Sequence, residues 1–201
     1  MDHVASKDWT QQTSRPHHPF LAIPEVFSPD ECRAIISLFS EYPVAPGMTW
    51  NGSGYSVNPE RRQVTTAYVP RDPRTLWVYE RMDKVFFKTA AYWGFDVRET
   101  VEDVKYLVYR ESDHFSQWHI DVGEDYSSRR KISMSIELCD SSEYEGGDMQ
   151  IFPTDKGHEA GPSRRAGNAL VFPSYRYHRV TPVTRGTRHV LVNWISGPPL
   201  R

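Results

Sequence analysis

The chain has 201 residues, and its 24 Lys and Arg against 26 Asp and Glu give a formal net charge of −2. This length fits one domain, and the charge balance lacks the basic excess of general nucleic-acid binders. No apolar run approaches the roughly 20 residues of a transmembrane helix, and residues 1–20 lack the apolar segment of a signal peptide. We therefore expect a cytoplasmic protein without a nucleic-acid or membrane partner, in which Cys32 and Cys139 are reduced thiols.

The N-terminal part predicts a flexible arm over residues 1–20, followed by two helices. Ser28-Pro29-Asp30-Glu31 has the composition of a capping box, and apolar residues then recur at helical spacing to about residue 42. Asp72-Pro73 predicts the start of a second helix that ends at Trp93, before Gly94. Between the two helices, residues 43–60 are rich in turn formers and predict a long loop, and 63–69 a short strand.

From residue 101 the apolar residues alternate with polar ones, which is typical of half-buried strands. Helices followed by strands predict an α+β fold, mainly β, in which a helical buttress over 28–94 supports a β-sandwich or jelly-roll core over 101–197. We expect residues 21–201 to form one domain. The expected strands lie near 103–111, 115–121, 131–138, 147–152, 168–173, 178–183 and 187–195.

Three polar residues in the strand-rich part have the side chains of a metal site. His119 and Asp121 share one face of a strand, because side chains two residues apart point the same way. His178 opens a later strand, and two imidazoles with one carboxylate make the facial triad of non-haem Fe(II) oxygenases. Zinc hydrolases use the same donor types, so the ligands alone do not select iron.

Arg188 lies on a strand face that also carries Val190, Val192 and Trp194. A charged group on an apolar face needs a partner, which is either a protein carboxylate or the carboxylate of a bound small molecule. Arg188 follows His178 by ten residues across one turn, so two adjacent strands would bring both residues to one pocket.

The order His-x-Asp, a long spacer, His, and Arg ten residues later resembles the Fe(II)/2-oxoglutarate dioxygenases, most closely the prolyl-4-hydroxylase-like branch. The resemblance covers about residues 104–199. Further segments stand in the order of that family: Arg130-Lys131-Ile132-Ser133, Tyr144-Glu145-Gly146-Gly147-Asp148, Gly167, Phe172-Pro173-Ser174, His178-Arg179-Val180-Thr181-Pro182-Val183, Gly186-Thr187-Arg188 and Trp194.

The resemblance implies a double-stranded β-helix (jelly roll) with the site in its mouth. His119, Asp121 and His178 would bind Fe(II) and form the catalytic centre, and Arg188 and Tyr109 would bind 2-oxoglutarate. The family often has Ser two residues after the Arg, where this chain has Val190. The candidates for replacing that hydroxyl are Tyr106, Ser133 and Asn193. O₂ is the second cosubstrate, and ascorbate is a candidate reductant.

The implied reaction oxidises 2-oxoglutarate to succinate and CO₂ while an aliphatic C–H is hydroxylated. A small amino-acid-like or peptide-tethered substrate is the first hypothesis, because loop residues with cationic or aromatic side chains flank the implied site. A protein hydroxylase acting on a prolyl or other side chain is the alternative, and a metal-binding module without turnover is a third. The candidate substrate-binding residues are Trp50, Arg61, Arg62, Tyr68 and Arg129.

Overall fold

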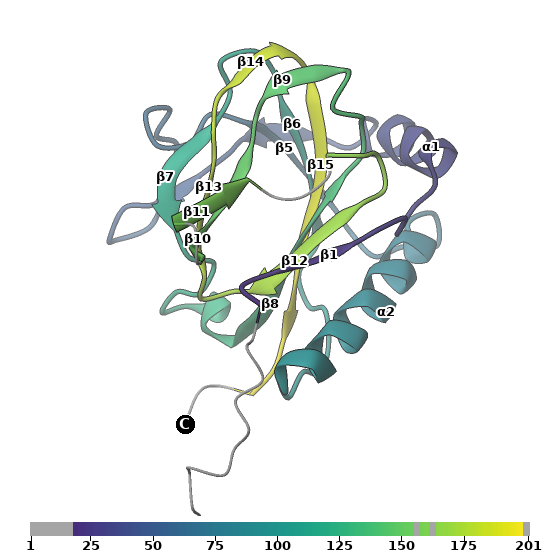
Figure 1. Ribbon diagram of the computed structural model, residues 1–201, viewed down its shortest axis with the longest axis vertical. Helices are drawn as coiled ribbons and strands as arrows, with labels where there is room; N and C mark the ends of the chain where they lie inside the picture. Colours follow the sequence, from purple (N-terminus) through teal and green to yellow (C-terminus); the bar gives the residue numbers. More distant parts are fainter. Residues whose placement is uncertain (1–17, 155–156, 161–163, 199–201) are drawn as a thin grey trace, which may run out of the picture.

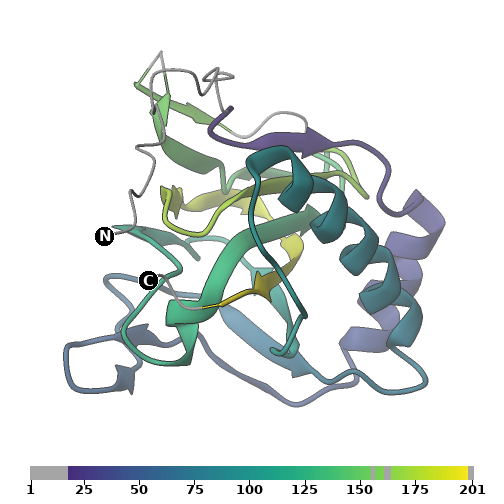
Figure 2. The same ribbon diagram turned by 90° about the horizontal axis from the view of Figure 1, so that it is seen from below.

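The computed structural model describes residues 18–154, 157–160 and 164–198, and most of the expected N-terminal arm lies outside them. Two β-sheets face one another, and two helices cover the outer face of the larger sheet (Figures 1 and 2). Side chains of both sheets line a cavity between them. The two helices thus buttress a jelly-roll core, as the sequence predicts. Among the described residues, no helix is long and apolar enough to cross a membrane.

The first helix, α1 (Pro29–Phe39), begins with the expected capping box. Ser28 accepts a hydrogen bond from the Glu31 backbone N–H, and the Glu31 carboxylate accepts one from the Ser28 N–H. The second helix, α2 (Leu76–Trp93), ends at Gly94, whose φ of 69° is the left-handed conformation that glycine favours. It begins three residues later than predicted, because Asp72 caps the turn before it by accepting from Arg74 N.

The larger sheet is antiparallel and joins strands from both ends of the chain. In the described part of the chain its spatial order is β1, β12, β8, β15, β6, β5 and β2. The bounds are Leu21–Ile23 (β1), Val44–Pro46 (β2), Thr65–Val69 (β5), Val104–Tyr109 (β6), Arg130–Glu137 (β8), Ala169–Pro173 (β12) and Arg188–Ser196 (β15).

The smaller sheet faces the larger one in the order β11, β10, β13 and β7. Two separate pairs, β14 with β9 and β3 with β4, complete the described strands. The bounds are Thr49–Trp50 (β3), Tyr55–Ser56 (β4), Phe115–His119 (β7), Tyr144–Gly146 (β9), Met149–Thr154 (β10), Gly157–Ala160 (β11), Tyr177–Val180 (β13) and Val183–Gly186 (β14).

The structure corrects several expected boundaries. The predicted loop 43–60 contains β2 and the short β3–β4 hairpin, and β1 pairs with β12 where no strand was expected. The predicted strands 147–152 and 178–183 have different ends in the structure. A separate strand, β9, precedes the first, and another, β14, takes over the end of the second; β9 and β14 pair with one another. These short pairs depend on contacts between distant segments, which local periodicity does not report.

Alternation along the larger sheet separates the hydrophobic core from the cavity. On β6, Val104, Tyr106 and Val108 belong to the core cluster that packs with the helices. The intervening residues Lys105, Leu107 and Tyr109 line the cavity instead. The same period of two holds on β15, where Leu191 and Ile195 face the core and Arg188, Val190, Val192 and Trp194 line the cavity.

Candidate active site

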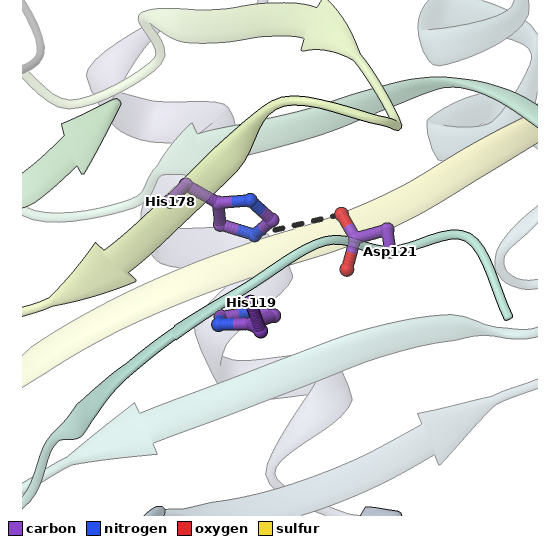
Figure 3. A group of neighbouring side chains, drawn as sticks. All are labelled: His119, Asp121 and His178. Carbon is purple, nitrogen blue, oxygen red and sulfur yellow. Dashed lines mark ion pairs between the residues drawn. The ribbon is translucent and has the colours of Figure 1, made fainter. Parts of the chain in front are cut away.

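The three predicted metal ligands meet at the mouth between the sheets. His119 ends β7, His178 lies on β13 directly opposite it in the antiparallel register, and Asp121 follows β7 by two residues (Figure 3). One ligand atom from each residue lies within 4.8 Å of the others, and His178 Nε2 is 3.6 Å from Asp121 Oδ2. Two imidazoles and one carboxylate at this spacing fit a divalent transition metal with open coordination positions.

The surroundings orient both imidazoles for metal binding. His119 Nδ1 lies 3.0 Å from the Gln117 carbonyl oxygen, and His178 Nδ1 lies 2.9 Å from that of Arg176. A carbonyl only accepts, so each Nδ1 carries the proton and each Nε2 presents its lone pair to the centre of the triad. Backbone contacts of this kind are the usual outer support of metal-binding histidines.

The carboxylate of Asp121 is held by Ser133, whose hydroxyl donates to Oδ2 at 2.6 Å. Burial raises the pKa of Asp121, but the charges of His178, His119 and Arg130 and the Ser133 hydrogen bond outweigh it and lower the pKa. Burial also lowers the pKa of His119, which favours the neutral imidazole that a metal requires. Asp121 and His119 therefore stand in the protonation states that bind a metal.

Arg188 lies deeper in the cavity, at the start of β15. It is 1% exposed, and its Nε and Nη2 donate to the two carboxylate oxygens of Glu137 on β8. The protein carboxylate that the sequence left open as a partner is therefore Glu137. Nη1 makes no hydrogen bond with any described residue, so one edge of the guanidinium remains available to a second carboxylate.

The prediction that adjacent strands carry Arg188 and His178 is wrong. The strand β14 intervenes, so the chain crosses from the smaller sheet to the larger one between them. The two residues consequently line the cavity from opposite sheets.

Two neighbours fix the place of Arg188. Tyr109 stands opposite it in the β6–β15 register, and the Arg188 guanidinium carbon is 5.5 Å from the centroid of that ring. Gly147 has a φ of 63°, and a Cβ there would lie 3.1 Å from Arg188 Cδ and 2.9 Å from Val183 Cγ2. The glycine in the sequence motif Glu145-Gly146-Gly147 therefore gives the arginine side chain its space.

The cavity has a volume of about 940 Å³, which is ample for a small-molecule site. It brings together many of the predicted site residues: His119, Asp121, His178, Arg188, Tyr109, Ser133, Trp50, Arg62 and Tyr68. The others lie elsewhere. Tyr106 faces the core and bonds His189 Nδ1 at 2.7 Å, and Asn193 faces away from the cavity and bonds Glu102 O at 3.4 Å. Arg61 and Arg129 are exposed outside it.

The placement of Tyr106 and Asn193 has one cause. Each lies one residue out of phase with the cavity face of its strand, between neighbours that do line the cavity. Ser133 is in phase, but its hydroxyl donates to Asp121 and lies within hydrogen-bond distance of Ser174 Oγ, at 3.0 Å. None of the three stands in the structure as a free replacement for the hydroxyl missing at Val190.

Sequence reasoning missed Glu137 and Lys105. The alternation that places Ser133 on the cavity side of β8 also places Glu137 there, four residues on. Lys105 shares the face of Tyr109 on β6 for the same reason. Both residues could have been predicted from the sequence, because each is a charged residue on the same strand face as a predicted site residue.

Comparison with known proteins places this site in a family. Residues 104–196 match the family model described as the 2OG-Fe(II) oxygenase superfamily. A PKHD-type hydroxylase from Picosynechococcus sp. is 27% identical over 177 residues, 88% of this chain and 78% of the relative. The chain belongs to the 2OG-Fe(II) oxygenase superfamily. Among the relatives of this oxygenase are several PKHD-type hydroxylases.

A further relative matches over less of its length, and two solved structures match over most of theirs. A PKHD-type hydroxylase from Aliarcobacter butzleri is 43% identical over 76 residues, which are 38% of this chain and about a third of the relative (33%). A prolyl-4-hydroxylase from Pseudomonas putida has the same fold, with a TM-score of 0.72 at 17% identity, over 90% of this chain and 94% of that one. A Trichoplax adhaerens prolyl hydroxylase solved with a peptide fragment also scores 0.72, at 16% identity, over 90% of this chain and 84% of that one.

Membership of this family implies Fe(II) with 2-oxoglutarate and O₂ as cosubstrates. The donor set fits such an iron centre, because both Nε2 atoms face the triad centre and the single carboxylate is ionised. Three protein ligands leave coordination positions for a chelating cosubstrate and O₂.

Proposed function

We propose that the protein is a 2-oxoglutarate-dependent hydroxylase that acts on an aliphatic C–H of a small amino-acid-like or peptide-tethered molecule and releases succinate and CO₂. One observation carries this proposal. The correctly oriented triad and the guanidinium of Arg188 line the same 940 Å³ cavity, with room between them for a dicarboxylate.

The chain contributes orientation and charge. Ser133 holds the Asp121 carboxylate, and the two backbone carbonyls hold the imidazoles, so the three ligands stay fixed during turnover. The free edge of Arg188 binds the distal carboxylate of 2-oxoglutarate, and the Tyr109 hydroxyl, which bonds no described residue, lies beside it. When bound, iron with 2-oxoglutarate and O₂ would supply the oxidising power.

A protein prolyl or other side-chain hydroxylase is the second candidate. The β3–β4 hairpin at the cavity carries the exposed aromatics Trp50 and Tyr55, whose ring centroids are 5.3 Å apart, and Tyr126 is exposed nearby on the cavity lining. Exposed aromatic side chains at a cavity mouth suit a peptide. The Trichoplax neighbour is itself bound to a peptide fragment.

A metal-binding module without turnover is the third reading. It has no need for Arg188 or for the open side of the triad. Substrate-dependent succinate release distinguishes the three functions. Release with free amino acids indicates the first, release with peptides indicates the second, and a module without turnover releases no succinate.

The first experiment is anaerobic addition of Fe(II) and then 2-oxoglutarate to the protein. Wild type is expected to show the visible charge-transfer band of the iron–2-oxoglutarate chelate, and His178→Ala is expected to lose it. Lys88→Met, an exposed change on α2, serves as the matched control and keeps the band. Tight zinc binding without any band in wild type would contradict the oxygenase proposal.

A further inference from the structure

The cavity also holds a half-buried lysine, Lys105, that the proposed chemistry does not use. Lys105 lies on β6 opposite Val192 of β15 and Tyr68 of β5, and its side chain lines the cavity. It stands four residues before Tyr109, the partner of Arg188, so about 13 Å of strand separates the two cations. One carboxylate therefore cannot contact both.

Lys105 has no anionic partner in the described part of the chain. Its Nζ forms no hydrogen bond or ion pair there, and its close neighbours are the rings of Trp194, 4.7 Å to the centroid, and Tyr68, 5.3 Å. The nearest carboxylates are already engaged. Glu102 pairs with Arg130 through both oxygens, and Asp121 belongs to the metal triad.

Further donors beside Lys105 are also unsatisfied. Trp194 Nε1 is buried and has no partner, although the Trp194 side chain lines the cavity. Arg62 Nε is buried and unpartnered as well, while its Nη1 donates to the Met48 carbonyl at 3.1 Å. Buried donors without partners cost free energy, and a cavity that retains several of them is built for an acceptor that binds from outside.

The surroundings of Lys105 disfavour its charged form. Burial, with the nearby charges of Arg62 and Arg130, lowers the pKa of Lys105 to about 8. The ammonium still predominates at neutral pH, so an incoming anion would meet a cation that water solvates poorly.

We infer that Lys105 and Trp194 Nε1 form a subsite for a free carboxylate of the substrate, at the other end of the cavity floor from Arg188. This inference rests on the proposed hydroxylase function. One ammonium and one indole N–H match the two oxygens of a carboxylate, whereas a phosphate would leave further oxygens unbonded. The Trp194 and Tyr68 rings beside the ammonium suit an apolar substrate body.

This subsite narrows the substrate class. A residue inside a peptide has its carboxyl group in an amide, so it offers Lys105 no charge. A free amino acid, another small carboxylic acid, or a residue with its own side-chain carboxylate does. The subsite therefore favours the small-molecule substrate over an internal prolyl residue.

The test follows the indole resonance of Trp194 in protein loaded with Zn(II) and saturating 2-oxoglutarate, which occupies Arg188 and prevents turnover. Trp194→Phe identifies this resonance among the six tryptophans. The probes are a pool of L-amino acids and the same pool as C-terminal amides, both without Asp and Glu. We expect the acids to shift the resonance with about tenfold higher affinity than the amides.

Lys105→Met is expected to abolish the shift, Lys105→Arg to retain part of it, and Lys88→Met to leave it unchanged. Equal responses to acids and amides, a shift that persists in Lys105→Met, or no shift by the acid pool at millimolar concentration would each overturn the subsite. The Fe(II)–2-oxoglutarate band is measured on the same variants. A normal band with a failed titration rejects the subsite alone, whereas an absent band rejects the hydroxylase proposal.

Discussion

Arg188 and Lys105 lie on the same face of the same sheet, yet the structure treats the two cations differently. Arg188 is paired through two donors with Glu137 and packed beside Tyr109 and Gly147. Lys105 has aromatic rings beside it but forms no ion pair among the described residues. One end of the cavity floor is therefore preorganised with its own counterion, and the other end lacks one.

The difference teaches how a site can divide its work. A cosubstrate that is the same in every turnover benefits from a rigid guanidinium that is already oriented. A lysine with a flexible stem and no protein partner leaves its charge to be satisfied by whatever binds. The following variants test this contrast, from the largest expected effect to the smallest.

Arg188→Met should lower the free energy of unfolding by about 3–5 kcal/mol, because it leaves the Glu137 carboxylate buried and unpaired. It should also raise the KM for 2-oxoglutarate strongly while leaving iron affinity nearly unchanged. Chemical denaturation and succinate kinetics measure the two effects. Adding Glu137→Gln should restore part of the stability and none of the 2-oxoglutarate affinity; an unchanged KM in Arg188→Met would remove Arg188 from the cosubstrate site.

Ser133→Ala should weaken Fe(II) binding by about 10- to 100-fold, because it removes the hydrogen bond that orients the Asp121 carboxylate. Anaerobic Fe(II) titration followed by the chelate band measures the effect. Ser135→Ala, two residues along β8 on the same face, is the matched control and should bind iron normally. Equal losses in both variants would point to a general disturbance of β8 instead.

Tyr109→Phe should raise the KM for 2-oxoglutarate about tenfold, because its hydroxyl lies beside the free edge of Arg188. Tyr106→Phe on the same strand removes a hydroxyl that bonds His189 on the core side. It should cost about 1 kcal/mol of stability and leave that KM unchanged. The reverse pattern of KM values would contradict the placement of Tyr109 in the cosubstrate pocket.

Lys105→Met should raise the stability by about 1–3 kcal/mol at neutral pH, because it removes a buried charge without a counterion. The folded pKa of about 8 is below the ordinary 10.5, so the unfolded chain binds more protons between these values. The wild type should therefore recover stability relative to the variant as the pH rises from 8 toward 10.5. Denaturation of both proteins across this range measures the difference; a destabilised variant would mean that the ring contacts of Lys105 are structural.

Much of the fold could be predicted because local patterns carried it. The capping box at Ser28, the glycine stop at Gly94 and the period-2 strands stand close to where the sequence puts them. The β1 strand and the β3–β4 hairpin could not be predicted in this way. Each of these strands is two or three residues long, and β1 exists because it pairs with β12, where Ala22 stands opposite Leu170, 148 residues later in the chain.

For the site, the sequence by itself determined the family and predicted the candidate metal ligands and Arg188, because the types and order of these residues carry the chemistry. Only the tertiary structure decided which neighbours complete them. It selected Glu137 as the counterion of Arg188 and Ser133 as the support of Asp121, and it placed Tyr106 and Asn193 away from the cavity. The physical reason is that ligand identity is a property of side chains, whereas pairing and burial depend on strand register between segments distant in the chain.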